Sequence, residues 1–149
     1  MASERWIVVG TDFSDGARHA LMRALDLAQD SHLNVALVHA YEDAPGAPSS
    51  ADPTSKLLAQ LAQEIFASGA TRRGINVAPF VRRGPPWDKI LNVATEQGAE
   101  VIVVGRSGQR GAVLGFPLGS VASRVLALST RCVLVAPSSA ASRQVRGAQ

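Results

Sequence analysis

The chain has 149 residues, of which 46% are hydrophobic and 18% are charged. This length suits one domain with a sizeable core, and the hydrophobic share is too high for a disordered chain. The longest apolar runs, such as residues 101–104 and 132–136, are far too short to span a bilayer, so we expect no membrane partner. The first six residues lack an apolar signal core, and the single cysteine rules out an internal disulfide framework. These features predict a protein of the reducing cytoplasm.

Basic residues outnumber acidic residues by 15 to 12, which gives a net charge of +3. They are scattered along the chain apart from the pairs Arg72-Arg73 and Arg82-Arg83, and no aromatic residues alternate with them. A nucleic-acid surface gathers its basic side chains into one patch or stripe. We therefore expect no nucleic-acid partner.

The first forty residues predict a strand, a helix and a second strand. Trp6 to Gly10 is an unbroken apolar run, which is typical of a strand buried on both faces. Ser14 is suited to cap a helix with an inward stripe of Ala17, Ala20, Leu21, Ala24, Leu25 and Ala28. Val35 to Ala40 predict the second strand, and the residues 42–51, rich in Pro, Ser, Ala and Gly, predict a loop.

A second helix and a third strand follow this loop. Asp52 is the expected N-cap, with Pro53 in the first turn and Gly74 at the end of the helix. The expected buried face of this helix is Leu58, Leu61, Ala62, Ile65 and Gly69. The third strand, Ile75 to Arg82, contains Pro79. Because proline cannot donate a hydrogen bond to a ladder, we expect this strand at an edge of the sheet.

The remaining elements continue the alternation. Pro85-Pro86 begin a third helix that ends near Gly98 and faces the core with Trp87, Ile90, Leu91 and Ala94. Residues 100–104 predict a fourth strand, 105–119 a glycine-rich loop, 120–128 a fourth helix and 132–136 a fifth strand. The residues 138–149, rich in Ser and Ala, predict a flexible tail behind one domain of residues 1–137.

Five strands alternating with four helices predict an α/β fold, in which a doubly wound parallel sheet carries helices on both faces. With the third strand at an edge, the strand order is 3-2-1-4-5. The chain then reverses direction between the first and fourth strands, and ligands of such sheets bind at this switch point. The residues expected there are Gly10, Thr11 and Asp12 from one strand end, and residues 105–108 from the other.

The loop after the fourth strand carries Gly105, Gly108, Gly111, Gly115 and Gly119. Glycines allow backbone N–H groups to converge on an anion, and the following helix adds the positive end of its dipole. The Ser120 hydroxyl could donate to a phosphate, and Arg106 or Arg110 could add charge. The alternative is a flexible loop whose glycines serve only tight turns.

Other polar residues offer fewer functions. Asp12 could either contact a ligand or cap the following helix. His19 is expected on the exposed face of the first helix, and His32 in a turn. His39 ends a strand, where a packed histidine is the expected state. No His, Cys and Asp cluster has metal-ligand spacing, and the Walker A, G-x-S-x-G and G-x-G-x-x-G motifs are absent from the sequence. Cys132, at the start of an apolar strand, is expected to be a small buried hydrophobe.

Several of these segments together resemble the universal stress protein family. Gly105-x-x-Gly108, Gly119-Ser120, residues 121–125 and the strand from Cys132 match that family's pattern. The opening residues 7–14, residues 36–40 and residues 82–85 are similar to it as well. The resemblance extends from about residue 5 to residue 137.

The resemblance implies the 3-2-1-4-5 fold and, in one branch of the family, ATP at the switch point, with or without Mg²⁺. Asp12, next to Thr11, matches the acidic residue near the nucleotide. Ala40 falls where backbone groups meet the adenine. The residues that match the phosphate-binding motif are Gly105, Gly108, Gly119 and Ser120.

The phosphate loop departs from the family pattern in length. Ten residues, 109–118, separate Gly108 from Gly119, which is one more than in the nucleotide-binding branch. The extra residue could bulge out of the loop, or it could shift the donors out of register with a triphosphate. The chain is accordingly either an ATP-binding stress or signalling protein, or an interaction or scaffold protein of the same fold that binds no nucleotide. With no positioned general base, it is expected to be no enzyme beyond slow ATP hydrolysis.

The fifth strand predicts the oligomeric state. Residues 132–135 would form an exposed apolar edge, and such edges invite pairing with another strand. The resembling family pairs this strand across a two-fold axis. We therefore expect a homodimer.

Overall fold

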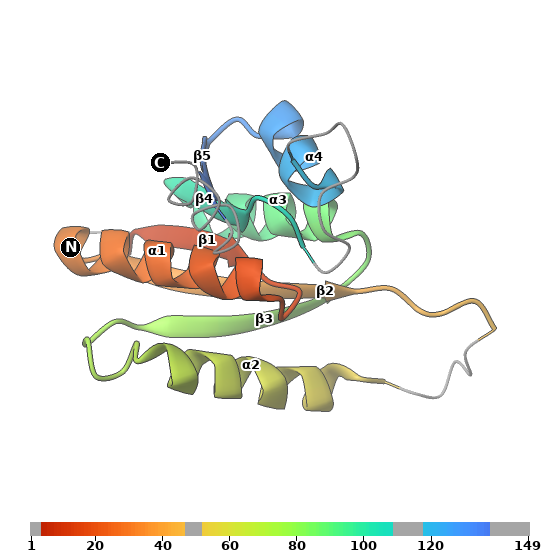
Figure 1. Cartoon of the computed structure of the whole chain (residues 1–149), viewed down its shortest axis with the longest axis horizontal. Helices are drawn as coiled ribbons and strands as arrows, with labels where there is room; N and C mark the ends of the chain where they lie inside the picture. The colour runs from red at the N-terminus through yellow and green to blue at the C-terminus, as the bar shows by residue number, and fades with distance from the viewer. Residues whose placement is uncertain (1–3, 47–51, 109–117, 138–149) are drawn as a thin grey trace, which may run out of the picture.

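The computed structural model describes residues 4–46, 52–108 and 118–137, and these form one α/β domain. Its parallel sheet has five strands in the order β3-β2-β1-β4-β5, as predicted (Figure 1). The strands are β1 (Trp6–Gly10), β2 (Asn34–Tyr41), β3 (Val77–Arg83), β4 (Val101–Gly105) and β5 (Cys132–Ala136). The strand that contains Pro79 lies at an edge, where the missing N–H of proline interrupts no second ladder.

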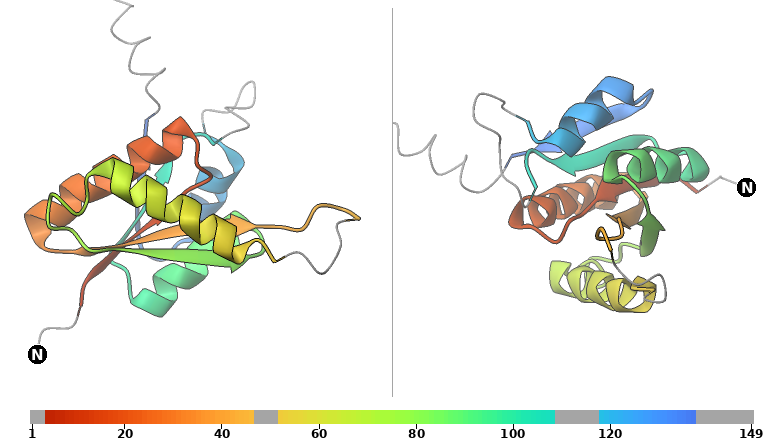
Figure 2. Two further views of the ribbon diagram at one scale, coloured as in Figure 1. Left: turned by 90° about the horizontal axis from the view of Figure 1, so that it is seen from below. Right: turned by 90° about the vertical axis from the view of Figure 1, so that its right-hand side faces the viewer.

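Helices cover both faces of the sheet (Figure 2). The described residues form α1 (Asp15–Ser31) and α2 (Thr54–Ser68) on one face, and α3 (Pro86–Gln97) and α4 (Ser120–Leu128) on the other. Alternate side chains of β1 enter different cores, Ile7 and Val9 under α1 and Val8 under α3. This two-sided burial explains why the central strands read as unbroken apolar runs.

Helix α2 differs from the prediction. Leu61 is its only fully buried side chain, while Leu58 and Ala62 are exposed, because α2 packs mainly over the edge strand β3 with a single narrow stripe. The helix ends at Gly69, whose φ of +79° suits glycine, and Gly74 lies in the turn that follows. Pro53 occupies the N-cap position. Asp52 instead accepts hydrogen bonds from the hydroxyl and then the N–H of Thr54, and these bonds, the hydroxyl's first, lower the pKa of the Asp52 carboxyl.

Cys132 is exposed, so the prediction of a buried thiol is wrong. It is the first residue of an edge strand, where burial alternates weakly along β5 and only Ala136 is buried. The apolar pattern predicted the strand, but among the described residues no further strand covers its outer edge.

The sheet opens at the carboxyl ends of β1 and β4. Strand β1 pairs with β2 as far as Gly10 and Val38, but with β4 only as far as Val9 and Val103. Beyond β1, the N–H of Thr11 donates to the carbonyl of Val38 on the β2 side. Beyond β4, the N–H of Arg106 donates to the carbonyl of Ala136 on the β5 side, away from β1. The backbone segments that follow β1 and β4 therefore diverge after the last residue pair of these strands, Val9 and Val103, and a crevice begins between them.

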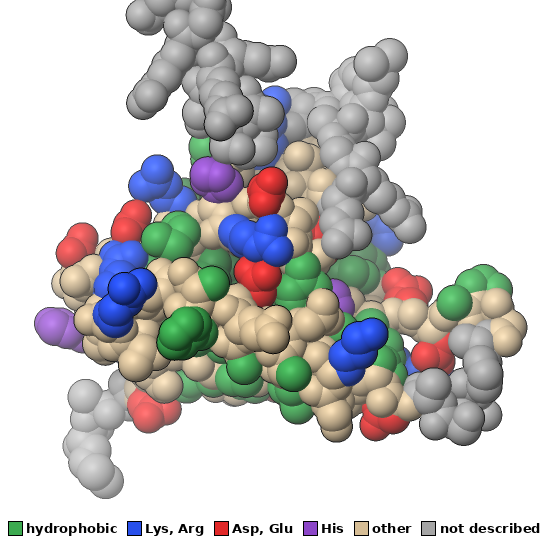
Figure 3. Space-filling model, turned by 60° about the horizontal axis from the view of Figure 1, so that its bottom comes forward, with side chains coloured by type: hydrophobic (Ala, Val, Ile, Leu, Met, Phe, Trp, Pro, Cys, Tyr) green, Lys and Arg blue, Asp and Glu red, His purple; other side chains and the backbone are tan. Residues whose placement is uncertain are grey.

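The face formed by α1 and α2 intersperses basic and acidic side chains (Figure 3). Arg18 of α1 bonds to Glu64 of α2 and to Asp15, and Arg73 bonds to Asp26. The hydrogen bonds to Glu64 are the main reason that the pKa of Arg18 is raised. The Arg18–Glu64 pair ties α2 to the start of α1, beside the loop that follows β1.

Candidate functional site

A cavity of about 830 Å³ lies at the crevice between β1 and β4. Its walls come from the ends of β1, β2 and β4, from the first turn of α1 and from the first two turns of α3 and α4. Every residue predicted for the site lines it: Thr11, Asp12, Ala40, Gly105, Gly108, Gly119 and Ser120. The volume falls within the range of small-molecule sites in proteins.

The cavity has an apolar side and a polar side. Val38, Ala40, Pro86, Trp87 and Ile90 supply apolar wall from β2 and α3. Trp87 and Ile90 were predicted only as core residues, since a residue that both packs and lines a cavity has no distinct signature in the sequence. The β1–α1 loop, the residues 105–108 and the start of α4 supply most of the polar wall. Such a division suits a ligand with a flat apolar part and a charged part.

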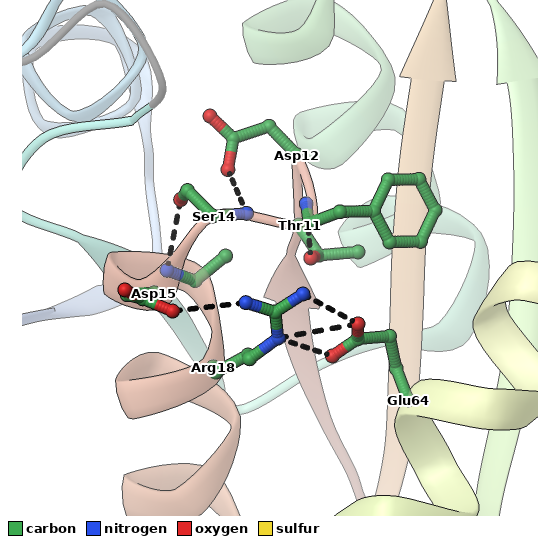
Figure 4. Close-up of polar contacts among 8 residues, drawn as sticks. Thr11, Asp12, Ser14, Asp15, Arg18 and Glu64 are labelled. Atoms are coloured by element: carbon green, nitrogen blue, oxygen red, sulfur yellow. Dashed lines mark hydrogen bonds and ion pairs between the residues drawn. The ribbon is translucent and has the colours of Figure 1, made fainter.

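Thr11 fixes the path of the β1–α1 loop. Its hydroxyl accepts a hydrogen bond from the N–H of Phe13 at 3.0 Å (Figure 4). Its own N–H donates to the carbonyl of Val38 in β2. Phe13 has a φ of +64°, a left-handed conformation that is strained for a bulky residue. Strain of this kind is retained where surrounding contacts hold it and is common at functional sites.

His39 supplies one of these contacts. Its Nδ1 lies 2.8 Å from the carbonyl oxygen of Thr11, and its ring packs on Phe13 with the ring centroids 4.5 Å apart. Because a carbonyl oxygen can only accept, Nδ1 is the donor. His39 is thus packed at the end of its strand, as predicted, and it also holds the β1–α1 loop in place.

We expect His39→Leu to lower the free energy of unfolding by about 1–3 kcal/mol, because the Thr11 carbonyl loses its donor. His39→Asn keeps a donor near the position of Nδ1 and should lose less. Thermal or urea unfolding measures both, with His19→Leu on the exposed face of α1 as the control. Equal stability of His39→Leu and the wild type would show that the loop needs no such brace.

Asp12 lies beside the start of α1 and lines the cavity, while its predicted contact with a ligand stays a prediction. Its Oδ1 accepts a hydrogen bond from the N–H of Ser14 at 3.0 Å, and Ser14 in turn caps α1 through the N–H of Ala17 at 3.2 Å. Figure 4 shows the Asp12 carboxylate on the opposite side of the loop from the Arg18–Glu64 ion pair. Oδ2 is directed at Gly108, where an added Cβ would lie only 2.3 Å from it.

The glycines bring the two loops of the site into contact. A Cβ on Gly105 would lie 3.0 Å from the backbone of Gly16, and one on Gly16 would lie 2.6 Å from the carbonyl oxygen of Ser107. The N–H of Gly119 already donates to the carbonyl of Arg106 at 2.8 Å. In the described residues these glycines thus serve close approach of backbone to backbone. Gly16 was missed because a lone glycine in an alanine-rich helix gives no signal of such a contact.

The phosphate-loop residues Arg110, Gly111 and Gly115 lie outside the described residues, as does the tail from 138. Within the described ranges, no three His, Cys, Asp or Glu side chains are grouped so as to hold a metal ion. No helix in the described part of the chain is long and apolar enough to cross a membrane.

The fold and cavity define a doubly wound α/β protein with a ligand-sized crevice at its switch point. The chain belongs to the universal stress protein family, whose family model matches residues 5–137. Universal stress protein Rv1636 of Mycobacterium tuberculosis is 31% identical over 137 residues, which cover 84% of this chain and 90% of that protein. Universal stress protein YxiE of Bacillus subtilis is 29% identical over 143 residues, covering 87% and 96%.

Solved structures share the fold over almost the whole chain. Universal stress protein UspA from Lactobacillus plantarum has a TM-score of 0.70 at 24% identity, over 91% of this chain and 99% of that one. A universal stress protein in complex with cAMP has a TM-score of 0.68 at 29% identity, over 93% and 100%. A protein of this family from Archaeoglobus fulgidus in complex with dAMP has a TM-score of 0.65 at 22% identity, over 91% and 98%.

Proposed function

We propose that this protein binds an adenine nucleotide, preferably ATP with or without Mg²⁺, in the cavity between β1 and β4. The observation that carries the proposal is the convergence of Thr11, Asp12 and Ala40 with the segment Gly105 to Gly108 and the Gly119-Ser120 pair on one cavity. The apolar side next to Ala40 suits a base. The first turn of α4 offers N–H groups and the Ser120 hydroxyl to phosphate.

The cAMP complex of a family member supports an adenine nucleotide as the class of ligand. In this chain the Gly119 N–H is bound to Arg106, so the donors to phosphate are the following N–H groups of α4 and Ser120. We propose binding and signalling in a stress response, with residues 1–137 as the working domain and the cytoplasm as its location. Hydrolysis is expected to be slow at most.

Thermal unfolding with added nucleotide tests the proposal. ATP with Mg²⁺ at about 100 times its Kd would stabilise the fold by about 2.7 kcal/mol, or roughly 5–11 °C in Tm for a chain of this size. AMP, cAMP and GTP titrated in parallel define the preferred ligand. No shift with any adenine nucleotide at millimolar concentration would overturn the proposal and favour an interaction protein of the same fold.

We also propose a homodimer through β5. Within the described part of the chain this strand pairs only with β4, and Leu134 on it is 38% exposed. Leu126 and Leu128 of the adjoining α4 are exposed as well. A two-fold axis beside the free edge would pair β5 with its own copy in antiparallel fashion and cover these side chains.

Leu134→Arg is expected to convert the dimer to a monomer, because it places a charge in the apolar contact. Leu27→Arg, at a position of nearly equal exposure (40%) on α1, is the matched control and should remain dimeric. Multi-angle light scattering at micromolar concentration measures both. A monomeric wild type would contradict the dimer without affecting nucleotide binding.

A further inference from the structure

Arg124 and Trp87 form a pair on the wall of the cavity. The guanidinium carbon of Arg124 lies 5.6 Å from the centroid of the Trp87 ring, within the range of a cation–π contact. Arg124 comes from the second turn of α4 and Trp87 from the first turn of α3, and both line the cavity. The contact thus joins the two helices at the rim of the crevice.

The position of Arg124 follows from the pitch of α4. Residues four apart lie on the same face of a helix, so Arg124 is one turn beyond Ser120 on the side that faces the cavity. A phosphate group at the start of α4 would meet the Ser120 hydroxyl and the first-turn N–H groups. A longer phosphate chain could extend along this face toward Arg124.

Arg124 has no carboxylate partner among the described residues, whereas Arg5, Arg18 and Arg73 are each paired with an acidic side chain. The described charged residues that line the cavity are Asp12, Glu42, Arg106 and Arg124. An aromatic ring holds the flat face of a guanidinium but leaves its N–H edge open to donate. Arg124 is therefore a positioned cation whose donors are not consumed by an ion pair.

We propose that Arg124, held by Trp87, is a specificity-determining residue that makes the cavity favour nucleoside di- and triphosphates over monophosphates. The inference rests on the proposed nucleotide-binding function and deepens it. Arginine binds phosphate oxygens through paired charge-assisted hydrogen bonds, which are about twice as strong as neutral ones. Each added phosphate offers Arg124 further oxygens to bind, while the contacts of the base and ribose with the cavity stay the same.

Calorimetric titration of wild type and Arg124→Gln with ATP, AMP and adenosine tests the inference. The wild type is expected to bind ATP more tightly than AMP. Arg124→Gln should weaken ATP about tenfold or more and AMP by less than about threefold. Arg124→Lys should lie between them, because lysine keeps the charge but lacks the planar fork. Arg23→Gln, which removes the same charge from the exposed face of α1, should leave the ratio of affinities unchanged.

Trp87 supplies a readout that does not depend on affinity. Trp6 is buried in the core, so Trp6→Phe leaves Trp87 as the reporter of the cavity wall. Movement of the guanidinium toward phosphate should change the Trp87 emission with ATP more than with AMP. Trp87→Leu should lower the preference for ATP in the same direction as Arg124→Gln.

The outcomes separate the two proposals. Equal weakening of ATP, AMP and adenosine in Arg124→Gln would overturn the role in phosphate selection and make Arg124 a contact to the nucleoside. An unchanged ATP-to-AMP ratio would also overturn it, while nucleotide binding itself stands. Absence of binding by the wild type would overturn the nucleotide-binding function, and the role of Arg124 with it.

Discussion

Gly108→Val is expected to remove the stabilisation of the protein by adenine nucleotides. A Cβ at position 108 would lie 2.3 Å from Oδ2 of Asp12, well inside contact distance, and the valine methyl groups add further bulk. Either Asp12 must leave its hydrogen bond to Ser14 or the segment 105–108 must withdraw from the β1–α1 loop. Both responses deform the polar side of the cavity. The nucleotide-induced rise in Tm should fall from roughly 5–11 °C to less than about 1 °C.

Gly74→Ala is the matched control for Gly108→Val. Gly74 has a φ of +72° and no atom within 4 Å of an added Cβ, and it lies in the turn before β3. Alanine there should lower the stability by about 1 kcal/mol through backbone strain and leave the nucleotide shift intact. A full nucleotide shift in Gly108→Val would place the ligand away from Asp12 and Gly108.

Gly16→Val is expected to lower both the stability and the nucleotide affinity. A Cβ at position 16 would lie 2.6 Å from the carbonyl oxygen of Ser107, and a backbone atom cannot rotate aside as a side chain does. Overpacking of this kind costs about 1–3 kcal/mol, and the backbone contact puts Gly16→Val at about 3 kcal/mol. The opposing gain in helix propensity over glycine is below about 1 kcal/mol, so the clash prevails. Thermal unfolding should show a fall of roughly 6–12 °C in Tm.

Asp30→Val, at an exposed position of the same helix, introduces the same side chain without a clash. It should change the free energy of unfolding by no more than about 0.5 kcal/mol. A Gly16→Val variant as stable as this control would show that α1 and the segment 105–108 can separate freely. In that case the close approach of the two loops would not define the cavity.

Some residues of the candidate site could be predicted from the sequence, and others could be found only in the structure. The cavity-lining positions of Asp12, Gly108 and Ser120 were predictable, because each lies within three residues of the end of a strand or begins a helix at a switch point that topology locates. The role of Arg124 was not predictable from spacing, since its partner Trp87 lies on another helix. The same holds for Gly16 and Ser107, whose contact depends on how closely α1 approaches the end of β4.

The sequence by itself determined the alternation of strands and helices, the edge position of β3 and the order 3-2-1-4-5. Unbroken apolar runs, a capping Ser14 and Pro79 are local signals, and right-handed crossovers leave few ways to join them. Only the tertiary structure decided that α2 buries little more than Leu61, that Cys132 is exposed and that His39 braces the loop at Thr11. The burial of a side chain and its hydrogen bonds to other elements depend on which element packs against it. Hydrophobic periodicity predicts which face of an element is covered, but not which element covers it.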